Sequence, residues 1–280
     1  MTSAQPGTGP GFMAPTELAR HIRRIILQQS RRAHVGHIGS ALSVADLLAA
    51  LYGGALRLST PDHPDRDRFV LSKGHAALAL YAALHLRGWL TAAELNTYCG
   101  DGTLLGVHPE RALRGIDFAT GSLGHGLSLA AGAALAARLS GSSRRAFALI
   151  SDAECNEGAV WEAAMFAAHH QLSNLVVIVD QNGQQALGHT SEVLDLSPLE
   201  ERWRAFGWDT RVVDGHDVGA LIETMRALDT RSGPPRILIA RTVFGAGVSY
   251  MRGQVKWHYL PMSEEEYQRA MIEVTGSPPQ

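Results

Sequence analysis

The stretch from Ala146 to Gln184 constrains the fold more than any other part of the chain, because it reads as strand, loop, helix, strand and loop. Its segments AFALI and LVVIVD are short, apolar and rich in β-forming residues, as strands buried on both faces of a parallel sheet are. Between them, apolar residues recur at helical spacing from Val160 to Ala167. This βαβ pattern predicts an α/β fold, with a mostly parallel central sheet and helices on both of its faces.

Two polar residues follow these strands. Asp152 comes directly after the first strand, and Asn182 comes two residues after the second. Because parallel strands end at the same edge of a sheet, both side chains return to the edge where open α/β sheets bind ligands. Their carboxylate and amide oxygens suit Mg²⁺ or Ca²⁺, and a helix that begins near Glu157 points its amino end at the same place. The pattern predicts a site for a metal-bridged diphosphate, although Asp152 alone is equally well explained as a cap or turn residue.

Composition places the chain among ordinary globular proteins and excludes several other classes. Of its 280 residues, 45% are hydrophobic and 19% are charged, and the net charge of −2 gives no electrostatic reason to bind nucleic acid or a membrane. No apolar run reaches membrane-spanning length, and the start of the chain lacks a secretory pattern. Cys99 and Cys155 are its only cysteines, so no disulfide framework is expected and a cytoplasmic location is predicted.

We expect a single domain over residues 16–275, and Thr16 is predicted to cap its first helix. Residues 1–15 are rich in Gly, Pro, Ser and Thr and are predicted to be a disordered tail, and residues 276–280 are predicted to fray.

Several histidines lie in or beside glycine-containing turns rather than on helix faces. They include His37 in GHIGSALS, His75 in LSKGH and His108 in GVHPE. A further one, His258, follows a glycine-rich loop over residues 245–253, which is either a mobile active-site cover or an irregular tail. Taken singly, a histidine in a turn is more often a surface or hydrogen-bonding residue. The segment GSLGHG has three glycines in six positions before a helix of small residues, which lets backbone N–H groups approach an anion.

In this order, the segments GHIG, LSKGH, HPE and GSLGHG, the Asp152–Asn182 unit and the late His258 resemble the transketolase family, over residues 16–275. The family's cofactor motif opens with Gly-Asp-Gly and closes with a pair that ends in Asn. This chain keeps the two metal ligands but has Ser151 and Ala153 in place of the flanking glycines. It also has His125 where many members of the family have Gln.

The resemblance implies thiamine diphosphate and Mg²⁺ (or Ca²⁺) as cofactors. It implies that the metal is held by Asp152, Asn182 and the backbone carbonyl of Gln184. The catalytic residues it implies are His37, His75, His108 and His258. The cofactor-binding residues it implies are His75, Gly121, Ser122, Leu123, Gly124, Asp152, Ala153, Glu157, Asn182 and His258. In the family, the position of Glu157 links the two cofactor sites of the assembly across the subunit contact.

In the family, the glutamate that activates the cofactor lies in a second, pyrimidine-binding domain, whereas this chain ends at Gln280. We therefore expect the N-terminal, diphosphate-binding subunit of a split transketolase. Such a subunit would transfer a two-carbon ketol unit between sugars or sugar phosphates only with a C-terminal subunit that carries the pyrimidine-binding domain and the activating glutamate, in an α2β2 assembly. The alternatives are deoxyxylulose-phosphate synthase or 2-oxoacid dehydrogenase chemistry on the same cofactor, and a non-catalytic cofactor-binding regulatory subunit, which only the Ser151 and Ala153 replacements favour.

Overall fold

One five-stranded parallel sheet forms the centre of the protein. The computed structural model describes residues 13–228 and 230–279. The strands are hydrogen-bonded in the order β1, β2, β3, β7, β6, and every neighbouring pair is parallel. The strands of this sheet are β1 (Arg68–Leu71), β2 (Ala146–Ser151), β3 (Leu175–Gln181), β6 (Asp209–Asp214) and β7 (Arg236–Arg241). A separate antiparallel pair consists of β4 (Gln184–Gln185) and β5 (Gly188–His189). The predicted fold class is confirmed.

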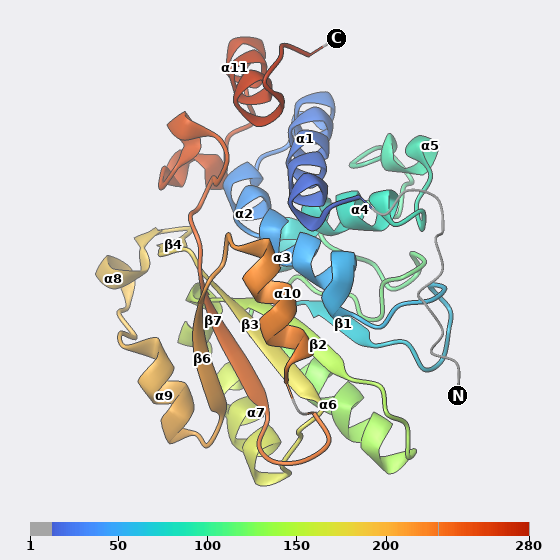
Figure 1. Ribbon diagram of the computed structural model, residues 1–280. Helices are drawn as coiled ribbons and strands as arrows, with labels where there is room; N and C mark the ends of the chain where they lie inside the picture. Colours follow the sequence, from blue (N-terminus) through green and yellow to red (C-terminus); the bar gives the residue numbers. More distant parts are fainter. Residues whose placement is uncertain (1–12, 229, 280) are drawn as a thin grey trace.

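Helices cover both faces of the sheet (Figure 1). One face packs against α1 to α4, α10 and α11, and the other against α6, α7 and α9. Side chains alternate between the two cores: in β2, Phe147 and Leu149 join the first, whereas Ala148 and Ile150 join the second. The helices are α1 (Pro15–Ala33), α2 (Ile38–Ser43), α3 (Ala45–Ala50), α4 (Ala77–Leu86), α5 (Ala92–Leu95), α6 (Gly126–Leu139), α7 (Gly158–His169), α8 (Thr190–Val193), α9 (Leu199–Ala205), α10 (Val218–Arg226) and α11 (Glu264–Thr275).

The predicted βαβ unit is present as β2, α7 and β3. Residues 146–151 of β2 pair in parallel with residues 175–180 of β3, so both strands end at the same edge. There the backbone N–H of Gly183 donates to Oδ2 of Asp152 at 2.8 Å, which joins the loops after the two strands. The unit therefore brings Asp152 and the Asn182 loop together, as the sequence predicts.

The start of the first helix differs in one detail from the prediction. Thr16 is not the cap of the first helix, because α1 begins at Pro15 with Ala14 as its N-cap. Proline suits the first helical position, since the N–H that it lacks would have no intrahelical partner there. Most of the predicted tail over residues 1–15 lies outside the described residues. At the other end, α11 stops at Thr275, where Gly276 adopts the left-handed conformation with φ 77°, and Gln280 lies outside the described residues.

The segment after β7 is packed rather than irregular. It carries two 3-10 helices, Ser249–Met251 and Val255–His258, and buries Phe244, Val248 and Trp257. The interpretation as an irregular tail is therefore wrong, and a mobile cover stays a prediction. Within the described ranges, no helix combines the length and the apolar character needed to cross a membrane.

Candidate cofactor site

A cavity of about 320 Å³ at the carboxyl edge of the sheet brings all four predicted histidines together. We call it the four-histidine cavity. Residues from seven separate segments of the chain form its wall, which explains why no single motif defines it. The lining residues are His37, Ser40, Lys73, His75, His108, Gly121, Leu123, Ser151, Ala153, Asn156, Glu157, Gln184, Gln185, Ala186 and His258.

Three of the histidine rings stand next to one another. His37 is the N-cap of α2 and has φ 59°, in the left-handed region. Its ring centroid lies 5.3 Å from that of His75, which in turn lies 6.4 Å from that of His258. Nε2 of His75 is 3.0 Å from Oγ of Ser40. A backbone hydrogen bond of 3.3 Å from the His37 N–H to the His258 carbonyl joins the two ends of the row.

Burial keeps these imidazoles neutral. It lowers the pKa of His258 to about 4, with the positive charge of Lys73 and then His37 acting in the same direction. Burial, followed by the charge of Lys73, lowers the pKa of His75 well below its ordinary value. Burial and then His108 lower the pKa of His37. Neutral imidazoles have one N–H donor and one acceptor each near pH 7, which suits them to hydrogen bonding and proton transfer.

Of the predicted metal ligands, Asp152 and Asn182 line a neighbouring cavity of about 460 Å³, whereas Gln184 lines the four-histidine cavity itself. Asp152 separates the two, because Ser151 and Ala153 on either side of it line the four-histidine cavity. Its Oδ1 accepts the N–H of Ala153 at 2.9 Å. Asn182 Oδ1 accepts the N–H of Gln184 at 2.9 Å. A carboxylate or amide oxygen has a second lone pair, so both side chains keep an acceptor site for a metal.

A buried aspartate that sequence reasoning missed orients Asn182. Asp180, the last but one residue of β3, is fully buried. Its Oδ2 accepts hydrogen bonds from Nδ2 of Asn182, at 2.9 Å, and from the buried ammonium of Lys73. Its Oδ1 accepts from Ser43, at 2.6 Å, and from Thr242. The hydrogen bond from Nδ2 to Asp180 fixes the orientation of the Asn182 amide. Asp180 therefore does not occupy the amide oxygen, Oδ1, of Asn182.

A second buried carboxylate, also missed, holds the glycine-rich loop. Oε1 of Glu154 accepts the Gly124 N–H at 2.9 Å and the Ser72 hydroxyl, and its Oε2 accepts the Ser151 N–H at 2.9 Å. Gly124 has φ 85°, and a Cβ there would lie 2.7 Å from Cβ of Glu157. Glycine is therefore required at this point of GSLGHG. Glu154 thus ties the ends of β1 and β2 to the loop that enters α6.

The two replaced glycines of the motif cause no strain. Ser151 ends β2 in extended conformation, Asp152 has φ −59° and ψ −39°, and Ala153 opens the 3-10 helix Ala153–Asn156. The hydroxyl of Ser151 accepts the N–H of Glu154 at 3.1 Å. Any L-residue adopts these conformations, so the turn does not depend on glycine.

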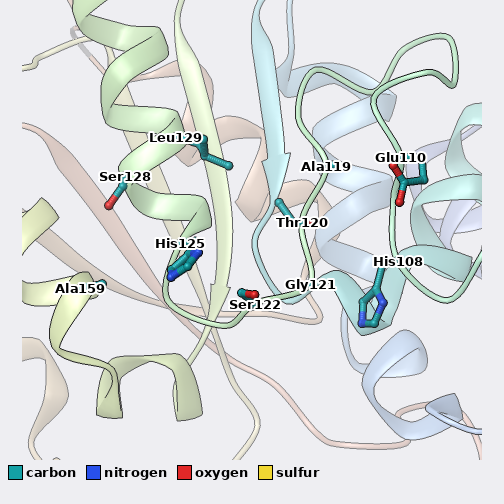
Figure 2. Close-up of a pocket in the computed structure, with 10 residues that line it drawn as sticks. All are labelled: His108, Glu110, Ala119, Thr120, Gly121, Ser122, His125, Ser128, Leu129 and Ala159. Atoms are coloured by element: carbon teal, nitrogen blue, oxygen red, sulfur yellow. The ribbon is translucent and has the colours of Figure 1, made fainter.

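Figure 2 shows a third cavity, of about 690 Å³, which shares His108 and Gly121 with the four-histidine cavity. We call it the outer cavity. Ser122 and His125 line it along the loop that leads into α6, and Ala159 borders it at the start of α7 (Figure 2). The helices α6 and α7 both begin near the two cavities, so the partial positive charges of their amino ends lie beside the space for a diphosphate.

The residues fit a metal-bridged diphosphate. Nδ1 of His37, Nε2 of His258 and Oε1 of Gln184 are buried and have no hydrogen-bond partner among the described residues. Burial and then the negative charge of Asp180 raise the pKa of Asp152 to about 7, which a bound cation would oppose. In the described part of the chain, no group of three or more His, Cys, Asp and Glu could hold a metal. A metal would therefore use one carboxylate, one amide oxygen, a backbone oxygen and the diphosphate itself, which suits Mg²⁺.

Comparison with known proteins defines the class of protein. The family described as transketolase, thiamine diphosphate binding domain, matches residues 15–279. The chain belongs to this family.

Two curated relatives match over nearly their whole length. The chain is 39% identical over 259 residues to the 6-deoxy-6-sulfo-D-fructose transketolase subunit SqwG of Clostridium sp. (strain MSTE9), covering 91% of this chain and 94% of the relative. It is 40% identical over 256 residues to an apulose-4-phosphate transketolase subunit of Phocaeicola vulgatus, covering 90% of this chain and 91% of the relative. The chain is thus similar to transketolase subunits and is a transketolase-like transferase.

Solved transketolases share the fold over a longer chain. The transketolase of Campylobacter jejuni superposes with a TM-score of 0.88 at 29% identity, over 95% of this chain and 43% of that one. The transketolase of Leishmania mexicana gives a TM-score of 0.88 at 30% identity, over 96% of this chain and 42% of that one. The chain therefore spans about two fifths of these transketolases.

Proposed function

We propose that this chain is the diphosphate-binding subunit of a split transketolase, which transfers a two-carbon ketol unit between sugars or sugar phosphates together with a separate pyrimidine-binding subunit. The observation that carries the proposal is the convergence of four histidines, two hard oxygen ligands and two helix amino ends at one edge of the sheet. The names of the two relatives, both subunits of sugar transketolases of similar length, support the activity and the division into subunits. The family match over residues 15–279 supports a single domain at 16–275.

In the proposed mechanism, Asp152 and Asn182, with the backbone carbonyl of Gln184, would hold Mg²⁺. When bound, thiamine diphosphate supplies a nucleophilic carbon at C2 of its thiazolium ring. His75 and His258 would donate hydrogen bonds to diphosphate oxygens or transfer protons as neutral imidazoles, and the pKa value of about 4 for His258 agrees with this form. The backbone N–H groups of residues 121–124, which include Ser122 and Leu123, would complete the diphosphate site.

His37 and His108 are proposed to face the substrate. Both line the four-histidine cavity, and His108 also borders the outer cavity (Figure 2), so it belongs to the walls of both cavities. Glu157, the N-cap of α7, lies on the same wall and is proposed to link the two cofactor sites of an assembly.

Exposed apolar side chains around the four-histidine cavity support the proposal that a partner subunit binds there. Leu187 is 80% exposed, and Tyr259 and Leu260 are 56% and 54% exposed. They flank lining residues, and the Tyr259 hydroxyl donates to the carbonyl of Ala186. Neighbouring exposed apolar groups on a soluble protein mark contact surfaces. We propose that a C-terminal subunit with the pyrimidine-binding domain and the activating glutamate covers this rim in an α2β2 assembly.

Free thiols support the proposed cytoplasmic location. Cys99 and Cys155 are both unpaired, and unpaired cysteines are typical of reducing compartments.

Calorimetric titration with thiamine diphosphate and Mg²⁺ tests the proposal. Asp152→Ala is expected to abolish Mg²⁺-dependent binding, because it removes the only carboxylate of the proposed ligand set. Asp195→Ala is the matched control: Asp195 lines the same neighbouring cavity but is not a proposed ligand, so its loss is expected to leave the affinity unchanged. Unchanged affinity in Asp152→Ala would refute the site.

The role of His258 is tested separately. His258→Ala is expected to lower turnover of the assembled enzyme more than it lowers cofactor affinity. A larger loss of cofactor affinity than of turnover would show that His258 only binds the diphosphate.

A further inference from the structure

The ring of Phe244 fills the space between Gly39 and His258. Phe244 is fully buried, and its ring centroid lies 4.5 Å from that of the His258 imidazole, with 30° between the two planes. On its other side, a Cβ at Gly39 would lie 2.1 Å from Cε1 of Phe244. The ring therefore occupies the volume that any side chain at position 39 would need. Phe244 contacts the first turn of α2 and a wall residue of the four-histidine cavity at once.

The backbone on both sides of Phe244 is fixed by hydrogen bonds. The N–H of Val243 donates to Nε2 of His216 at 2.9 Å. The N–H of Gly245 donates to the carbonyl of Gly39 at 3.1 Å, so the glycine that admits the ring also binds the turn that carries it. The Gly245–Gly39 hydrogen bond joins residues more than 200 positions apart in the sequence, and the Val243–His216 bond joins residues 27 positions apart. Together they fix the backbone that carries Phe244 and leave its side chain little freedom.

A buried ion pair between Arg23 and Asp46 stabilises the backbone on both sides of Phe244. Because Nε2 of His216 accepts a hydrogen bond, its proton is on Nδ1, which donates to Oδ2 of Asp46 at 2.6 Å. Asp46 also pairs with both terminal nitrogens of Arg23, and Nε of Arg23 donates to the carbonyl of Ala246 at 3.1 Å. Burial raises the pKa of Asp46, but the hydrogen bonds from His216 and Arg23 and the Arg23 charge outweigh it and hold the pKa below its usual value.

We propose that Phe244 is the positioning residue for His258, and that its ring, seated on Gly39, sets the plane of the imidazole in the cavity wall. Phe244 is not among the residues that line the four-histidine cavity, so it acts through His258. This accounts for the second glycine of GHIG, because the Phe244 ring leaves no room for a side chain at position 39. The inference rests on the proposed function in taking His258 as a cofactor-facing residue.

The other groups around His258 are accounted for. The charge of Lys73 and the ring of His37 act on it from the cavity side, the His75 ring centroid lies at 6.4 Å, and Tyr259 follows it in the chain at 6.1 Å between centroids. Phe244 lies nearer to the imidazole than these rings do, with 4.5 Å between centroids and 30° between the planes, so it packs against one face of the ring. Shortening Phe244 is therefore expected to admit water to that face and to let the imidazole tilt.

The test measures the pKa of His258 in the chain without cofactor, by NMR of ¹³C-labelled histidine, with its signal assigned by its loss in His258→Gln. Phe244→Leu is expected to raise this pKa by about one unit, because partial hydration relieves the burial that lowers it. Phe147→Leu is the matched control: Phe147 is equally buried, in β2, and belongs to the same core. It is expected to lose comparable stability and to leave the His258 pKa unchanged. An unchanged pKa in Phe244→Leu, or equal shifts in both variants, would overturn the proposal.

A second pair of variants keeps the proposal testable if Phe244→Leu folds poorly. Gly39→Ala is expected to lower the unfolding midpoint in urea, because its methyl group meets the Phe244 ring. The double variant Gly39→Ala/Phe244→Leu is expected to be more stable than Gly39→Ala alone, since the smaller leucine leaves room. Additive losses would contradict the seating of the ring on Gly39. Neither measurement needs cofactor, so failure here is distinct from failure of the calorimetric test of Asp152.

Discussion

Replacing Lys73 by Met is expected to cost about 3–5 kcal/mol of unfolding free energy, the range found when one partner of a buried ion pair is removed. Lys73 is 1% exposed and Asp180 is fully buried, so neither charge can turn to water if the other is lost. Three further hydrogen bonds remain on Asp180, from Ser43, Asn182 and Thr242. They are neutral donors and do not replace a positive charge, which places the expected loss in this range rather than near zero.

A double-mutant cycle measures the interaction itself. Asp180→Asn leaves the Lys73 ammonium buried without its ion-pair partner and is expected to cost a similar amount. In Lys73→Met/Asp180→Asn no unpaired charge remains, so the loss is expected to be smaller than the sum of the single losses by about 2 kcal/mol or more. The chain contains five tryptophans, so urea unfolding followed by fluorescence suits the measurement.

Arg20→Met is a matched control for the single variant, because Arg20 pairs with Glu17 on the surface, where both side chains are about half exposed. It is expected to change stability by less than about 0.5 kcal/mol. If Lys73→Met were equally mild, or if the cycle were additive, the reasoning about the buried pair would be refuted.

Three further predictions concern residues around the site, each measured by urea unfolding. Ser72→Ala is expected to cost about 2 kcal/mol, because it removes a donor to the buried Glu154 carboxylate. Gly124→Ala, at φ 85°, is expected to cost at least about 1–3 kcal/mol, whereas Gly132→Ala, with no atom within 4 Å of the new Cβ, is expected to gain up to about 1 kcal/mol. The pKa of Asp46 is held below 3.8 by its hydrogen-bond and ion-pair partners, so it adds stability above that pH, which is lost as the pH falls through the folded-state pKa. Asp46→Asn should therefore be less stable near pH 7 and show a shallower loss of stability below about pH 4.

The parts of the site that sequence could predict are those that lie in turns at strand ends. Asp152 and Asn182 follow two apolar strands of one βαβ unit, so topology alone brings their loops together. Family motifs predict the site roles of the histidines, and the structure places His37, His75, His108 and His258 in one cavity.

The residues that hold the site in place escaped prediction because their partners are distant. Asp180 binds Ser43 and Lys73, which lie 137 and 107 positions away, and Glu154 binds Ser72 across 82 positions. No local pattern reports such contacts. One signal was available: an aspartate at the end of the apolar run LVVIVD has to be paired if the strand is buried on both faces. It indicates that a partner exists without saying which residue supplies it.

The central claim is that this chain binds the diphosphate half of the cofactor and depends on another subunit for its activation. Deuterium exchange at C2 of thiamine diphosphate with Mg²⁺, followed by proton NMR, tests it without knowledge of the substrate. The measurement is made with this chain alone and with this chain mixed with a subunit that carries the pyrimidine-binding domain. We predict acceleration of exchange only in the mixture. Acceleration by this chain alone would contradict the account, because the activating group would then lie within its 280 residues.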